Sequence, residues 1–119
     1  MNTMQLAQAL VALCREGQEA FDALYAADAV SVEPGPQGRE DRGIAALKAK
    51  SAWWYGEHEV HAFSCSGPWP HGDRFILRFE IDVTHRASGQ RMQMEEMGLY
   101  TVRDGKIVRE EFFYDTTGN

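Results

Sequence analysis

The chain has little of what membrane-spanning, disulfide-bonded or nucleic-acid-binding proteins need. No stretch approaches the roughly 20 apolar residues of a membrane-spanning helix, and the first residues lack the basic segment of a secretory signal. The two cysteines, Cys14 and Cys65, stand far apart, which indicates neither a zinc pair nor a disulfide framework. The 18 Asp and Glu outnumber the 12 Lys and Arg, for a formal net charge of −6. Because nucleic acids and anionic membranes bind clustered cations, we expect neither partner.

Signatures of cofactor and metal chemistry are missing as well. The sequence contains no Gly-rich phosphate loop, no nucleophile elbow and no Cys/His dyad. His58 and His61 would point to opposite faces of a strand, whereas the helical zinc pattern needs histidines at i and i+4. We therefore expect no metal and no organic cofactor. With 119 residues, we expect one domain over 1–119, since two would each be too small to bury a core, and the free thiols favour a cytoplasmic location.

The first part of the chain shows helical spacing of its apolar residues. This spacing predicts a helix over residues 6–14 that ends at Gly17, and a short helix over 21–25. Val30 and Val32 then alternate as in a strand, with Glu33 at its exit and a Pro- and Gly-rich loop over 34–42. A third helix is expected from Asp41, a possible N-cap, to residue 55, with Lys50 off its apolar side.

From Glu59 onward the pattern has the period of a strand. We expect strands over 60–66, 75–84, 91–102 and 107–115, with a turn-rich connection over 67–72 and a tight turn at Asp104-Gly105. Helices followed by long strands predict an α+β fold. We expect the N-terminal helices to pack in the concave face of a strongly curved antiparallel sheet, as a cone-shaped barrel with an apolar hollow.

Two runs of residues carry a resemblance to a known family. The order of elements, the run Tyr25-Ala-Ala-Asp-Ala-Val-Ser-Val-Glu-Pro34 and the closing Thr101-Val-Arg-Asp-Gly-Lys-Ile-Val108 resemble the SnoaL-like branch of the nuclear-transport-factor-two-like superfamily, which has a cystatin-like fold. The resemblance implies a pocket for an apolar small molecule and a homodimer formed through the outer face of the sheet. It also implies cofactor-independent chemistry of the isomerase, cyclase, dehydratase or hydrolase type. The superfamily includes non-enzymes, so a non-catalytic ligand-binding or dimerisation module is the alternative.

The resemblance assigns a role to Glu33. Ketosteroid isomerase, a member of the superfamily, has its proton-shuttling Asp, followed by Pro, where this chain has Glu33-Pro34. Glu33 is thereby implied as the general base. Burial raises the pKa of a carboxyl group held at the mouth of an apolar cavity, which suits proton transfer near neutral pH. A solvated loop carboxylate is the other interpretation.

Other positions depart from the superfamily's known sites. Leu10 stands where the isomerase has its oxyanion-hole Tyr, and Met97 to Leu99 stand where it has a protonated Asp. Limonene-type epoxide hydrolases use an Arg and two Asp on strands, and Arg78-Phe79-Glu80 matches part of that pattern.

Glu110 and Glu96 are the candidates for a second acid–base group, and the turn at Asp104-Gly105 decides which side chains join them. With a two-residue turn, Leu99 pairs with Glu110; with a three-residue bulged turn, Gly98 lies opposite Glu110 and Glu96 shares its face. The predicted ligand contacts are Tyr25, Trp54, Tyr55, Met97, Leu99, Phe112 and Tyr114. Among them, Tyr55 or Tyr114 would donate a hydrogen bond to a ligand oxygen.

Overall fold

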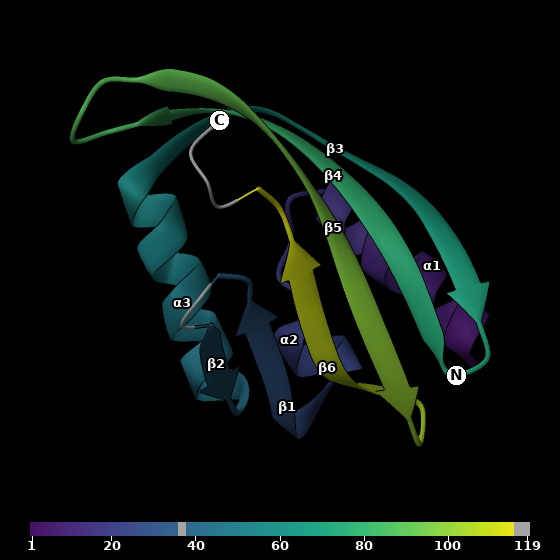
Figure 1. Ribbon diagram of the computed structural model, residues 1–119. Coiled ribbons are helices and arrows are strands. Elements are labelled where there is room, and N and C mark those ends of the chain that lie inside the picture. Colours follow the sequence, from purple (N-terminus) through teal and green to yellow (C-terminus); the bar gives the residue numbers. More distant parts are fainter. Residues whose placement is uncertain (36–37, 116–119) are drawn as a thin grey trace.

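The computed structural model describes residues 1–35 and 38–115, which form three helices and one six-stranded sheet. The helices are α1 (Thr3–Arg15), α2 (Phe21–Leu24) and α3 (Ile44–Glu57). The strands are β1 (Tyr25–Glu33), β2 (Arg39–Arg42), β3 (His58–His71), β4 (Arg74–His85), β5 (Arg91–Arg103) and β6 (Lys106–Phe113). Their order across the sheet is β2-β1-β6-β5-β4-β3 (Figure 1). None of the described helices is long and apolar enough to cross a membrane.

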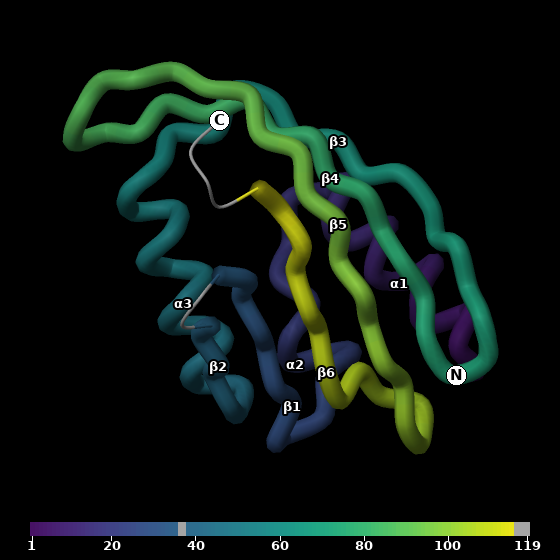
Figure 2. Tube along the Cα trace, in the orientation of Figure 1, coloured from purple at the N-terminus to yellow at the C-terminus, as the bar shows by residue number. Residues whose placement is uncertain are grey.

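The sheet is curled but not closed, and the helices lie within its curve (Figure 1). Helix α1 lies against β3 and β4, while α3 lies against β1, β2 and the start of β3. The tip of the β4–β5 hairpin reaches the end of α3, where the Arg86 amide donates a 2.9 Å hydrogen bond to the Glu57 carbonyl (Figure 2). The predicted α+β fold, with helices on the concave side of a curved sheet, is confirmed. One detail differs, because β6 runs parallel to β1 and the sheet is therefore mixed.

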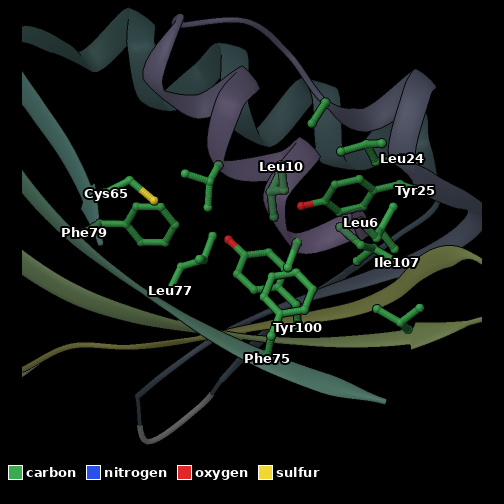
Figure 3. Packing of buried hydrophobic residues seen from close by; sticks show 14 of the residues in the cluster. Leu6, Leu10, Leu24, Tyr25, Cys65, Phe75, Leu77, Phe79, Tyr100 and Ile107 are labelled. Atoms are coloured by element: carbon green, nitrogen blue, oxygen red, sulfur yellow. The ribbon is translucent and has the colours of Figure 1, made fainter. Parts of the chain in front are cut away.

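The core lies between α1 and the concave face of the sheet. On β4 the alternation predicted from the sequence is observed, with the side chains of Phe75, Leu77 and Phe79 buried against α1. Phe75 stacks on Tyr100 of β5 with ring centroids 5.0 Å apart, beneath Leu6 and Leu10 of α1 (Figure 3). This packing fixes the inner wall on which the candidate site is built.

Two element boundaries differ from those predicted. Residues 39–42, predicted as loop, form β2, because they pair with the end of β1. Asp41 is paired with Ser31 in that ladder, so α3 begins at Ile44 with Gly43, not Asp41, as its N-cap. Pro36 and Gln37 of the predicted loop lie outside the described residues.

Strand β3 is also longer than predicted. It continues through residues 67–70, where the sequence predicts a turn, with its pairing to β4 irregular between Ser66 and Trp69. The chain reverses at Gly72 and Asp73 instead.

The register between β5 and β6 determines which carboxylates face inward. Asp104-Gly105 is a two-residue turn, with Arg103 paired to Lys106 and φ positive at both central residues, as a type I′ turn requires. The register then shifts by one residue between Thr101 and Val102. Beyond this shift Tyr100 pairs with Glu110, so neither predicted partner, Leu99 or Gly98, is the observed one. Glu96 nevertheless shares the face of Glu110, as the three-residue turn predicted.

Candidate functional site

A cavity of about 1010 Å³ lies between the helices and the concave face of the sheet. Its walls are largely aromatic and aliphatic, with residues such as Leu10, Phe21, Trp54, Phe79, Tyr100 and Phe112. Charged residues line it as well, among them Glu33, Glu96, Glu110 and Lys50. This size is that of a pocket for a small organic molecule.

Glu110 is the most deeply buried carboxylate of the cavity, with 5% of its surface exposed. Strand β6 places it opposite Tyr100 and next to Ser31 of the parallel strand β1. The Tyr25 hydroxyl donates a hydrogen bond to its Oε1, and the Ser31 hydroxyl donates one of 2.6 Å to its Oε2. Burial raises the pKa of Glu110, and the two donated hydrogen bonds oppose this rise.

Lys50 connects Glu110 to Glu33 through a chain of hydrogen bonds. Its ammonium donates to the Ser31 hydroxyl at 2.6 Å and lies 2.7 Å from Oε1 of Glu33. The other Glu33 oxygen, Oε2, accepts a 3.0 Å hydrogen bond from the Tyr114 hydroxyl. The side chains of Lys50 and Glu33 are only 15% and 22% exposed, so water screens this ion pair little.

Glu96 lines the same cavity from β5, opposite Phe79 of β4. Burial raises the pKa of Glu96 to about 7; the charge of Glu33 adds to this rise and that of Lys50 opposes it. Within residues 1–35 and 38–115, no hydrogen bond or ion pair engages its carboxyl group. With a pKa of about 7, Glu96 is a candidate for proton transfer near neutral pH.

The structure brings most of the predicted site residues together. Lining the cavity are Glu33, Glu96, Glu110, Tyr25, Trp54, Tyr55, Phe112 and Tyr114. Met97 and Leu99 do not line it. They lie on the convex face of the sheet, because the regular pairing of β5 with β4 sets Tyr100 and Gly98 beside the buried Phe75 and Leu77 and turns the residues between them outward. The roles assigned to all these residues remain predictions.

The charged residues of the partial match to epoxide hydrolases, Arg78 and Glu80, do not line the cavity. Arg78 contacts Glu95 at 3.0 Å and Glu80 at 2.8 Å on an exposed part of the sheet. It also pairs with Met97 in the ladder, which places it on the convex face.

Sequence reasoning missed Lys50 and Ser31, although the signals were present. Ser31 lies two residues before Glu33 on a strand, so the two side chains share a face. Lys50 lies three residues after buried Leu47 and four before Trp54 in α3, on the same side of the helix. The prediction that Lys50 lies off the apolar side of this helix is wrong, because Lys50 lines the cavity together with Leu47 and Trp54.

The fold defines the class to which the protein belongs. An NTF2-like protein from Burkholderia thailandensis has the same fold, with a TM-score of 0.85 at 22% identity over 98% of this chain and 92% of that chain. TerC, co-crystallised with polyporic acid, has a TM-score of 0.74 at 22% identity over 96% of this chain and 92% of that chain. The chain thus has the NTF2-like, cystatin-like architecture, with the cavity inside the curled sheet.

Within this class, the sequence identifies the family. The SnoaL-like domain matches residues 1–114. A SnoaL-like protein from Mesorhizobium loti, proposed to be a polyketide cyclase, is 42% identical over 96% of this chain and all of that chain, with a TM-score of 0.88. The protein belongs to the SnoaL-like family. A comparison with curated proteins finds no match.

Proposed function

We propose that the protein is a cofactor-independent acid–base enzyme that moves a proton at a carbon beside a carbonyl group of an apolar small molecule. The main support is the placement of Glu33 and Glu96 in one largely aromatic cavity, with only Glu33 paired to a cation. Such different surroundings let one carboxyl group act as a base while the other holds a proton. Membership in the SnoaL-like family supports this chemistry, since isomerases and cyclases share its fold.

Glu33 is the base in this proposal. Its carboxylate lies 2.7 Å from the ammonium of Lys50, and it has lone pairs beyond the two that accept from Lys50 and Tyr114. Glu96 is the group that returns a proton to the product. With a pKa of about 7 it is partly protonated at neutral pH, where a general acid works best.

The proposal is tested with 2-tetralone, an apolar ketone with acidic C–H bonds, by following the exchange of its α-protons for deuterium in D₂O by NMR. We expect the protein to catalyse this exchange, and Glu33→Gln and Glu96→Gln each to slow it by about 10²-fold or more, the usual contribution of general acid–base catalysis. Glu95→Gln is the matched control, because Glu95 neighbours Glu96 in β5 but is ion-paired to Arg78 on the exposed face.

Full exchange activity in Glu33→Gln would contradict the assignment of the base. A non-catalytic ligand-binding module is the second candidate, favoured by the engagement of both Glu33 oxygens in polar contacts. A module of this kind would bind 2-tetralone with similar affinity in the wild type and in both Gln variants. It would show no exchange above that of the buffer.

A further inference from the structure

We propose that Lys50 is a catalytic residue that stabilises the negatively charged substrate oxygen formed in this reaction. As the reaction proceeds, the substrate oxygen replaces the Glu33 carboxylate as the negative charge that neutralises the ammonium. The inference rests on the proposed function. It identifies the electrophilic group that the reaction needs, and implies that the substrate oxygen binds beside Glu33.

The geometry places one donor of Lys50 at the cavity. An ammonium group has three N–H donors. One points to Glu33 at 2.7 Å and one to Ser31 at 2.6 Å, while Phe112, a cavity residue, has its ring centroid 5.2 Å from Nζ. No third acceptor for Nζ is found among residues 1–35 and 38–115. A ligand oxygen beside the Phe112 ring would accept the hydrogen bond of the third N–H donor of Lys50.

The other cations along the cavity are engaged elsewhere. Lys48 is 2.7 Å from Asp22 at the solvent-exposed rim, the Arg15 guanidinium donates to the Cys65 carbonyl at 3.3 Å, and Arg39 pairs with Asp41 at 2.9 Å. Leu10, which lines the cavity from α1, carries no donor. Within the described part of the chain, Lys50 is thus the cation that lies beside the proposed base.

The charge balance of the reaction explains why this arrangement favours the transition state. Glu33 takes the proton as the C–H bond breaks, the electron pair of that bond forms a new C–C double bond, and the π pair of the C=O bond moves onto the oxygen. The carbonyl oxygen gains the negative charge that Glu33 loses. Lys50 is neutralised by Glu33 before the step and by the substrate oxygen after it, so its attraction to that oxygen grows as charge develops.

The test uses 4-nitrophenolate, whose charged oxygen on a flat ring resembles the enolate, and 4-nitroanisole, its uncharged counterpart. Both are titrated into Glu33→Gln, in which the neutral amide stands for protonated Glu33, in buffer alkaline enough to ionise the phenol. We expect this variant to prefer the phenolate over the anisole. Adding Lys50→Met should reduce that preference at least about tenfold, since a contact ion pair at partial burial is worth that much or more.

Two further variants control for folding and for long-range charge. The double variant of Glu33→Gln with Lys50→Met should fold, because it has no carboxylate at position 33. Lys50→Met alone would leave the Glu33 carboxylate half-buried without its cation. Adding Lys50→Arg to Glu33→Gln keeps a cation and should keep the preference for phenolate. Adding Lys48→Met removes the same charge from the same helix, away from Glu33, and should also keep it.

Equal preference in the presence and absence of Lys50 would overturn the proposal, as would failure of Glu33→Gln to bind the phenolate. Because this experiment measures binding, its outcome is separate from that of the exchange assay. Loss of exchange in Glu33→Gln without a Lys50-dependent preference would leave the base in place and exclude Lys50 as the oxygen-binding group.

Discussion

Glu95 and Glu96 are adjacent in β5 and yet differ in chemistry, because successive side chains of a strand point to opposite faces. Glu95 is exposed, and its ion pair with Arg78 lowers its pKa. Glu96 is turned into the cavity, where burial raises its pKa to about 7. The environment alone therefore makes one of two identical side chains a candidate acid.

Because the pKa of Glu96 is raised and that of Glu95 is lowered, the two side chains should change the free energy of unfolding with pH in opposite directions. Between about pH 4.5 and 7 the folded protein holds a proton on Glu96 that the unfolded chain releases, so the contribution of Glu96 to stability falls as the pH rises through this range. We expect Glu96→Gln to raise the free energy of unfolding by up to about 3 kcal/mol above pH 7 and to have little effect near pH 4.5.

Urea unfolding at a series of pH values measures this effect. Glu95→Gln is the control with the opposite sign of pH dependence. The lowered pKa of Glu95 means that its carboxylate stabilises the fold at neutral pH, and this stabilisation is lost as the pH falls below the usual pKa of a glutamate. If the difference in free energy of unfolding between wild type and Glu96→Gln were the same from acidic to alkaline pH, Glu96 would be solvated and the prediction would be wrong.

Strand β5 contributes several inward-facing side chains to the site, and one inward position, Gly98, has no side chain. Gly98 lies between Glu96 and Tyr100 on the inward face and opposite Phe112. A Cβ at this position would lie 2.8 Å from Cε2 of Tyr100 and 3.2 Å from Cε2 of Phe79. The glycine is thus required for the close approach of two aromatic rings, not for an unusual backbone angle.

Gly98→Ala should destabilise the protein by about 1–3 kcal/mol, the usual cost of overpacking a core. Gly56→Ala in α3 is the matched control, since a Cβ there would meet no neighbouring atom within 4 Å. It should leave stability unchanged or raise it by up to about 1 kcal/mol through helix propensity. Thermal or urea unfolding of both variants distinguishes the two effects, and equal stability of Gly98→Ala and wild type would contradict the packing argument.

The curl of the entire sheet gives the protein two different faces. The concave face holds the core and the cavity, and the convex face carries Met97, Leu99 and Phe113, with Phe113 half exposed at 51%. A homodimer through the outer face, which the family resemblance implies, would cover these apolar side chains.

We therefore expect the protein to sediment as a dimer in analytical ultracentrifugation, and Phe113→Glu to shift the equilibrium towards the monomer. A charge at an apolar interface is costly unless it is paired. A monomeric wild type at all accessible concentrations would contradict the predicted dimer, without bearing on the chemistry of the cavity.

The class of fold and the composition of the inner wall follow from the amino-acid sequence alone. The alternation of Phe75, Leu77 and Phe79 requires a half-buried strand, and the spacing of Leu6 and Leu10 requires a helix to cover it, because both patterns follow from local geometry. The position of Glu33 at the end of a strand was predicted in the same way and is observed.

Which side chains meet depends instead on how the elements pack and pair. The regular pairing of β5 with β4 places Glu96 inward and Met97 and Leu99 outward. On β6 the extra residue Val108 brings Glu110 and Phe112 to the same inner face, since a one-residue shift of register exchanges the two faces of a strand. The parallel pairing of β1 with β6 brought Ser31 to Glu110, and the packing of α3 brought Lys50 to Glu33. Local spacing could indicate which face of its own element Ser31 or Lys50 occupies, but these contacts join different elements, so their partners depend on the tertiary structure.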